Sequence, residues 1–174
     1  STPGVHFFDT GNYDYMSKLW TDSIRVPFDL VVFDHHPDMQ PPRFEGILSC
    51  GGWIKEVLDN NKFMQNVTVI GVADHLVEEI REDLSQANAA EILERVTFIR
   101  ESELTAVTPE GRSPDRVHLT SHTTPVYISI DKDALSMQEA ATNWDQGSLT
   151  FEQLAETLQT LAQNRKILGI DICG

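Results

Sequence analysis

Two apolar segments of this sequence, far apart in the chain, each run directly into residues that can bind metal ions. The first reads DLVVFD over Asp29–Asp34 and continues as HHPD to Asp38; the second reads VYISID over Val126–Asp131 and continues as KD to Asp133. Uninterrupted apolar runs of this length are typical of strands in a sheet covered on both faces. Ligands of open parallel α/β sheets bind beyond the carboxyl ends of the strands, where both acidic segments are predicted to lie.

Residues two apart in an extended chain point the same way, because side chains alternate in direction. Asp34, His36 and Asp38 are therefore expected to point together, with His35 and Pro37 turned away. Carboxylates with one imidazole suit Mn²⁺, Mg²⁺, Fe²⁺ or Zn²⁺, and a carboxylate-rich set favours the harder ions. For either segment alone, an ordinary helix cap or loop is an equal alternative. Together, acids gathered without a cation would repel one another, so the two segments predict a metal site.

The elements that must position these residues alternate between strand-like and helix-like patterns along the whole chain. This alternation predicts a three-layer α/β/α fold with a mostly parallel central sheet, built as a single domain over residues 1–174. Thr150, with Gln153 three residues later, predicts a capped helix start, and the irregular stretch Ser102–Ser121 predicts a long loop. The expected strands are Val5–Asp9, Asp29–Asp34, Val67–Val72, Val96–Ile99, Val126–Asp131 and Lys166–Ile172, and the expected helices are Tyr13–Ile24, Gly52–Asn60, Leu76–Gln86, Ala89–Glu94 and Thr150–Asn164.

Composition narrows the classes of partner. A net charge of −14 over 174 residues argues against nucleic acids and anionic membranes, which need basic surfaces, and is compatible with a cation-binding site and a cationic small-molecule substrate. No apolar run is long enough to cross a bilayer, and no signal peptide is visible, although the chain could begin inside a longer gene product. Two cysteines are too few for a disulfide framework, which favours a cytoplasmic protein. Homo-oligomer formation is left open.

Several segments resemble motifs of the arginase, agmatinase and histone deacetylase superfamily. FDHHPDMQ and ISIDKDAL resemble its DAHxD and SxDxDxxDP segments, NWDQGSLTFEQL resembles its PxxGGLT turn, and GIDICG resembles a last strand ending in D-x-x-E. The resemblance covers nearly the whole chain in order. It implies a metal-dependent hydrolase that cleaves a guanidino, ureido or amide C–N bond with metal-activated water.

The resemblance also implies a set of metal ligands. Asp34 and Asp131 would bridge two metal ions, His36 and Asp133 would complete one site, and Asp38 would join the other. Two Mn²⁺ ions are the expected cofactors, with Zn²⁺ and Fe²⁺ as alternatives.

Other positions depart from the motifs of that superfamily. Asp14 falls where a histidine ligand is expected, and Gly174 falls where a glutamate would clamp a guanidinium, so arginine or agmatine hydrolysis does not follow. Gln40 falls at a polar position near the substrate, and Ser49 and Cys50 are candidates for the pocket wall. For the last two, a small-residue turn leading into a helix is the simpler interpretation.

Two other functions remain open from the sequence. Asp-His-His after an apolar strand is also the signature of Mn²⁺-dependent DHH phosphoesterases, in which Asp9 and His35 would be ligands. The departures at Asp14 and Gly174 instead favour a non-catalytic metal-binding domain of the arginase fold. The catalytic proton carrier is not identified; His118 and His122 are candidates because imidazole titrates near neutrality.

Overall fold

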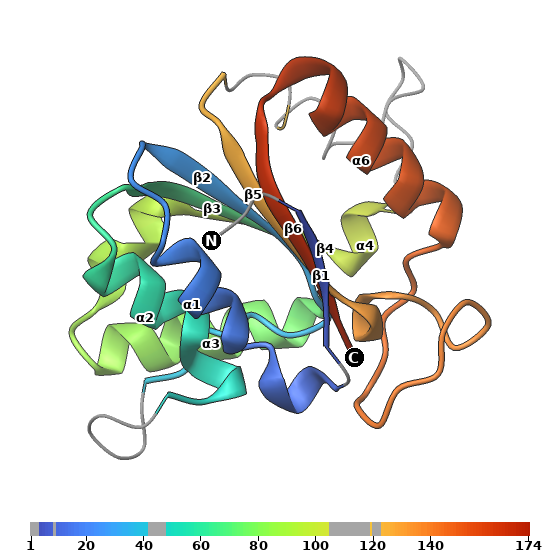
Figure 1. The fold of residues 1–174 in the computed structure, drawn as a ribbon. Coiled ribbons are helices and arrows are strands. Elements are labelled where there is room, and N and C mark those ends of the chain that lie inside the picture. Colours follow the sequence, from blue (N-terminus) through green and yellow to red (C-terminus); the bar gives the residue numbers. More distant parts are fainter. Residues whose placement is uncertain (1–3, 9, 42–47, 105–118, 120–122) are drawn as a thin grey trace.

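Six strands form one sheet in the order β1-β6-β5-β2-β3-β4, and every neighbouring pair is parallel. The computed structural model describes residues 4–8, 10–41, 48–104, 119 and 123–174. Helices cover both faces of the sheet, α1, α2 and α3 on one and α4 and α6 on the other (Figure 1), which confirms the predicted three-layer α/β/α fold. The strands are β1 Val5–Phe7, β2 Phe28–Phe33, β3 Met64–Val72, β4 Val96–Arg100, β5 Val126–Asp131 and β6 Ile167–Cys173, and the helices are α1 Met16–Thr21, α2 Trp53–Asn60, α3 Asp74–Gln86, α4 Glu101–Leu104 and α6 Phe151–Asn164.

The central strands consist mainly of apolar residues because both of their faces are buried. Every residue of β2 and β5 is buried. Leu30 and Val32 belong to the core beneath α2 and α3, whereas Val31 and Phe33, pointing the other way, belong to the core beneath α6. Burial of this apolar surface is the main stabilising contribution to the fold, and it fixes the carboxyl ends of β2 and β5 side by side.

The prediction of a buried strand at Val5–Asp9 was wrong in its burial. β1 lies at the edge of the sheet, pairs with β6 alone, and leaves Val5 53% and Phe7 75% exposed. His6 is half-buried, with its ring stacked on Trp20 at 4.7 Å between centroids. The apolar composition of this segment resembles that of the central strands, and only the strand order reveals that β1 has one neighbour.

Several predicted boundaries changed because local turns replaced helix. The expected helix Tyr13–Ile24 is shorter, with a 3₁₀ helix at Gly11–Tyr13 before α1, and the expected helix Ala89–Glu94 is a 3₁₀ helix at Ala90–Arg95. In the expected loop Ser102–Ser121, the first residues belong to α4, and most of the remainder lies outside the described residues. Asp9, His118 and His122 also lie outside the described residues.

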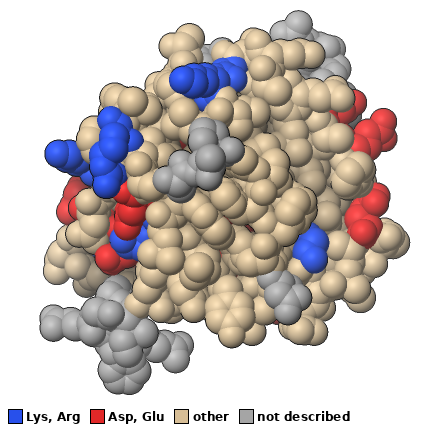
Figure 2. Space-filling view, viewed as in Figure 1, with Lys and Arg blue, Asp and Glu red and all other residues tan. Residues whose placement is uncertain are grey.

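Charged side chains are mixed on the face shown in Figure 2. Basic groups lie in separate places on this face, some of them beside acidic groups, and most of the surface between them is uncharged. Within the residues that the structure describes, no helix is both long and apolar enough to cross a membrane.

Thr150 caps α6 as the sequence predicted, and its removal should measurably weaken the fold. Thr150 Oγ1 accepts a hydrogen bond from the Gln153 amide at 3.2 Å, and Gln153 Oε1 accepts one from the Thr150 amide at 2.9 Å. Thr150→Ala leaves one amide without its partner, so we expect the free energy of unfolding to fall by about 1 kcal/mol in urea denaturation. Thr160→Ala, within the same helix, is the control and should change little. Equal stability of the two variants would contradict the capping role.

Candidate metal centre

The two acidic segments meet where the chain reverses its direction across the sheet. From β2 the chain proceeds to its neighbour β3, whereas from β5 it proceeds to β6 on the other side. β2 and β5 are themselves adjacent and in register, with Phe33 opposite Ile130. Their helical connections therefore leave on opposite sides, which opens a crevice beyond the strand ends at this point of parallel α/β sheets. Asp34 and Asp131 lie at this crevice.

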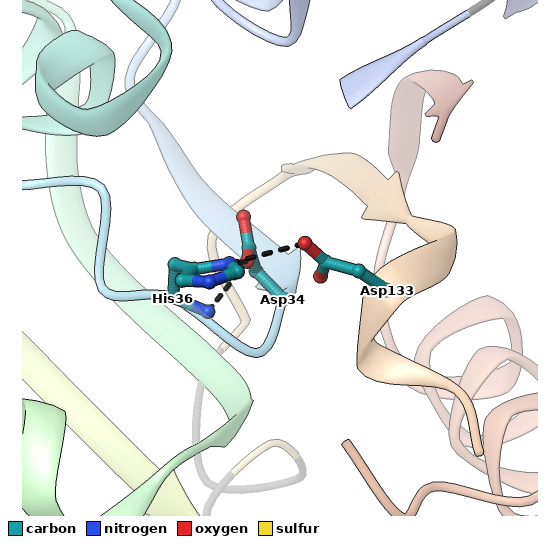
Figure 3. Close-up of side chains that lie close together, drawn as sticks. All are labelled: Asp34, His36 and Asp133. Atoms are coloured by element: carbon teal, nitrogen blue, oxygen red, sulfur yellow. Dashed lines mark hydrogen bonds and ion pairs between the residues drawn. The ribbon is translucent and has the colours of Figure 1, made fainter. Parts of the chain in front are cut away.

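Two groups of three side chains in this crevice have the geometry to hold a metal ion. Asp34, His36 and Asp133 form one group, and Asp14, Asp34 and Asp131 form the other, with the candidate ligand atoms of each group within 4.8 Å of one another. His36 Nδ1 lies 3.0 Å from Asp133 Oδ2 and 3.4 Å from Asp34 Oδ1 (Figure 3). Asp34 belongs to both groups, so its carboxylate connects them.

Backbone amides hold three of these carboxylates in place. The amide of His36 donates to Asp34 Oδ1 at 2.6 Å, and the amide of Asp133 donates to Asp131 Oδ1 at 2.9 Å. The amide of His35 donates to Asp133 Oδ1 at 3.1 Å and so links the two acidic segments directly. These bonds orient the acids before any ligand arrives, which favours binding because less order must be gained.

Asp38 reaches the cavity by a route that the alternation argument did not predict. The chain leaves β2 at Phe33, and Asp38 adopts a left-handed backbone with φ of 48°, a conformation that aspartate tolerates better than most residues. Trp53 Nε1 donates to Asp38 Oδ2 at 3.0 Å and fixes the carboxylate. Pro37 lines the cavity, contrary to expectation, whereas His35 is buried and is not among the residues that line it.

Asp14 enters the cluster from the 3₁₀ turn that follows β1. It is buried, and its Oδ1 atom has no hydrogen-bond partner among the described residues. Burial, followed by the charge of the Asp38 carboxyl and a hydrogen bond to it, raises the pKa of Asp14 to about 12. A buried carboxyl oxygen without a partner is costly unless a cation satisfies it, so the residues present fit a metal ion.

The pKa values of the cluster rise because the acids are buried close together. Burial, then the charges of Asp38 and Asp133, raises the pKa of Asp34, and burial with the charge of Asp133 raises that of Asp131 to about 6. Burial also raises the pKa of Asp38. Burial is the largest single influence on His36 and by itself would lower its pKa, but the hydrogen bond to Asp133 and the negative charges of the neighbouring aspartates together raise it. Without a cation, the cluster therefore retains protons that a metal ion would displace.

All nine residues predicted for the site line one cavity of about 540 Å³. Gln40 lies at the rim of the cavity, where its backbone N–H donates to the Gly51 carbonyl at 2.7 Å. Ser49 and Cys50 lie in the turn that leads into α2, and both also line the cavity. The nine are Asp14, Asp34, His36, Asp38, Gln40, Ser49, Cys50, Asp131 and Asp133.

The sequence argument missed two tryptophans of the site. Trp53 holds Asp38, and Trp144 lines the cavity with its ring edge-to-face against His36, at 5.7 Å between centroids. Their spacing in sequence from the acidic segments carries no signal of contact, because the loops that bring them there have no regular period.

Two glycines, Gly11 and Gly174, pack too closely against Asp131 to carry side chains. A Cβ atom at Gly11 would lie 2.7 Å from Asp131 Oδ2, and one at Gly174 would lie 2.5 Å from Asp131 Oδ1. The φ of Gly174 is 94°, which also disfavours any other residue. The thiol of Cys173 donates to Asp131 Oδ2 at 3.3 Å. Position 174 therefore contributes no side-chain carboxylate to the cavity.

Asp171, in the last strand, takes no part in the cavity. It is fully buried, and its Oδ1 accepts hydrogen bonds from Ser129 Oγ at 2.7 Å and Ser17 Oγ at 3.0 Å. These bonds tie α1 to β5 and β6 beneath the site. Burial raises the pKa of Asp171 to about 6 even though these hydrogen bonds lower it.

The protein is thus an α/β protein with a parallel central sheet. It has carboxylates at the switch point of that sheet, and these could hold a divalent metal. The chain belongs to the Arginase family, which it matches over residues 6–174. It is 32% identical over 171 residues to an uncharacterised protein of Thermotoga maritima, covering 98% of this chain and 58% of that protein.

Solved structures show the same fold. Proclavaminate amidino hydrolase from Streptomyces clavuligerus is 18% identical with a TM-score of 0.72, and the match covers 97% of this chain and 54% of that one. Formimidoylglutamase from Bacillus subtilis is 18% identical with a TM-score of 0.67, and the match covers 96% of this chain and 51% of that one. Arginase from Medicago truncatula is 19% identical with a TM-score of 0.63, and the match covers 96% of this chain and 49% of that one. The chain thus spans about half the length of these solved relatives.

Family membership decides between the two hydrolase families considered from the sequence. The DHH phosphoesterase interpretation was wrong, because the chain matches the Arginase family along nearly its whole length. The geometry agrees, since His35, which that interpretation needs as a ligand, is absent from the residues that line the cavity.

Proposed function

We propose that this protein is a metal-dependent hydrolase that cleaves a C–N bond of a guanidino, ureido or amide compound. The observation that carries the proposal is the pair of acidic groups sharing Asp34 at the carboxyl ends of β2 and β5. The family assignment supports it, since divalent metals are typical of that family.

Six side chains would hold the metal ions in this proposal. His36 and Asp133 would bind one ion, Asp14 and Asp38 would bind the other, and Asp34 and Asp131 would bridge them. The oxygen-rich ligand set favours two Mn²⁺ ions, and the single imidazole also allows Zn²⁺ or Fe²⁺. When bound, such ions supply Lewis acidity and lower the pKa of a water molecule to near neutrality.

The remaining residues would prepare the site and receive the substrate. The Trp53 indole keeps the Asp38 carboxylate directed into the cavity, and the backbone amides at His36 and Asp133 keep two further acids from rotating. Gln40, Ser49 and Cys50 are proposed to contact a small-molecule substrate from the rim and wall of the cavity. The volume of about 540 Å³ is in the range of small-molecule sites.

A non-catalytic metal-binding domain is a second candidate, favoured by one observation. Position 174 is a glycine packed against Asp131 with no room for a side chain, so it has no side-chain carboxylate to clamp a guanidinium. In either function we propose that residues 1–174 act as one domain, in the cytoplasm, without nucleic-acid or membrane partners. Formation of homo-oligomers is compatible with both.

Turnover distinguishes the two candidates. We expect the purified chain loaded with Mn²⁺ to release urea, ammonia or a carboxylate from at least one compound in a panel of guanidino, ureido and amide substrates. The same protein treated with chelator is the control and should be inactive, because the proposed reaction needs metal ions to lower the pKa of the attacking water. Metal binding without turnover on any compound would reject the hydrolase and favour the binding domain.

A further inference from the structure

The loop between β5 and α6 presents one aromatic side chain, that of Trp144, to the cavity. Hydrogen bonds within the loop hold this residue in place. Thr142 Oγ1 pairs with both the amide and the carbonyl of Trp144, at 3.3 Å each. The side chain of Gln146 bonds to the backbone of Thr142, Leu135 and Ala140 at 3.1–3.2 Å. Trp144 is therefore displayed by a braced loop, and ligand binding need not order it.

The indole lies directly beside the acid cluster. A Cβ atom placed on Gly11 would be 3.4 Å from Trp144 Cδ1 and 2.7 Å from Asp131 Oδ2, so both side chains converge on this bare glycine. The ring also stands at 71° to the ring of His36. Trp144 remains 41% exposed, although it is large and apolar. Part of its aromatic surface thus faces the space next to the proposed metal ligands.

Apart from His36, the ionisable side chains of aspartate and glutamate type dominate the lining of this cavity. Besides the aspartates of the cluster, the cavity is lined by Glu79 and Asp83 of α3, and none of the described residues lining it is lysine or arginine. An aromatic surface attracts cations through its negative face, and tryptophan does so most strongly. Acidic walls raise the local concentration of a cationic ligand further. A planar cation suits this combination better than a neutral or anionic group.

We propose that Trp144 determines specificity by holding a planar, positively charged C–N group of the substrate against its indole, beside the acid cluster. This inference rests on the proposed function, because it names the side chain that would receive a guanidino-type substrate in the same cavity. In this proposal an aromatic surface recognises the cation, because the glycine at position 174 has no side-chain carboxylate that could do so. Trp144 takes no part in bond cleavage.

Two probes of nearly the same shape test this proposal by binding alone. Butylguanidinium carries the charge, and butylurea is its neutral counterpart. Isothermal titration into Mn²⁺-loaded protein should show tighter binding of butylguanidinium. Trp144→Leu keeps apolar volume but removes the π system. It should weaken the binding of butylguanidinium by roughly 5- to 30-fold and the binding of butylurea by no more than about twofold. Trp144→Phe should fall between wild type and Trp144→Leu.

Phe151→Leu is the matched control, because Phe151 is an aromatic residue 64% exposed at the start of α6 and is not among the residues lining the cavity. It should leave both affinities unchanged. Equal weakening of both probes in Trp144→Leu would overturn the cation assignment, as would failure of butylguanidinium to bind the wild-type protein at millimolar concentration. Binding that follows the Trp, Phe, Leu order without any turnover would reject the hydrolase and leave this inference standing.

Discussion

Asp34→Asn is expected to abolish the binding of Mn²⁺ at both positions of the acid cluster. Asp34 is the one residue common to the two groups of candidate ligands, so its loss removes a charge and a ligand atom from each. Loss of an outer-shell partner alone typically weakens a metal site by about 10- to 100-fold, and loss of a bridging ligand should exceed about 100-fold. Metal analysis after dialysis and isothermal titration should give two ions per wild-type chain and none for the variant, with loss of any hydrolysis.

Comparison with a second variant separates bridging from a general loss of charge. Asp133 belongs to one group only, so Asp133→Asn should retain one ion per chain. Asp59→Asn removes an exposed aspartate on α2, paired with Lys55, and should retain both. Two ions bound by Asp34→Asn would refute its bridging position, and none bound by the wild-type chain would remove the metal centre altogether.

The fold of Asp34→Asn should survive, because the buried carboxyl it replaces is already costly. Burial and the neighbouring acids raise the pKa of Asp34, so in the metal-free chain asparagine resembles the protonated acid in shape and charge. We therefore expect the metal-free variant to unfold at a temperature equal to or above that of the metal-free wild type. A large fall would point to a structural role instead.

The second large effect is a loss of stability as the pH rises, caused by Asp171. Its folded-state pKa, raised from 3.8 to about 6, means that the folded chain keeps a proton that the unfolded chain has released. Between about pH 4 and pH 6 the unfolded state therefore binds fewer protons, and the free energy of unfolding falls as the pH rises through this window. A shift of this size corresponds to roughly 3 kcal/mol.

Asp171→Asn isolates this contribution. Asparagine does not titrate, and its carbonyl oxygen can still accept the hydrogen bonds of Ser17 and Ser129. Urea denaturation in the presence of chelator should give similar stabilities near pH 4 and a more stable variant near pH 7. Parallel stability curves for the two proteins would show that Asp171 does not titrate in this range. Chelator is essential, because Asp131 also titrates near pH 6 and metal binding would displace its proton.

Local patterns in the sequence were sufficient for the central sheet and for the acidic segments. Continuous apolar runs identified β2 and β5, and Thr150 with Gln153 identified the start of α6. These features depend on neighbours in the chain. The spacing of apolar residues, a helix cap and burial on both faces can each be recognised from a few consecutive residues. For the same reason the residues that follow β2 and β5 could be predicted to meet at one edge of a parallel sheet.

Contacts between distant segments were decided only by the tertiary structure. The alternation argument placed Asp38 toward the site, yet its left-handed backbone and the indole of Trp53 put it there, and Pro37 lines the cavity as well. β1 reads like a buried strand but lies at an edge.

The sequence by itself therefore determined the class of fold and the cluster of acids beyond the ends of β2 and β5, because both follow from short-range patterns. The tertiary structure decided which side chains surround that cluster. Trp144 reaches His36, and Gly174 closes against Asp131, through loop conformation and strand register. Neither of these leaves a periodic signal in the sequence, because each is fixed by packing between segments that are distant along the chain.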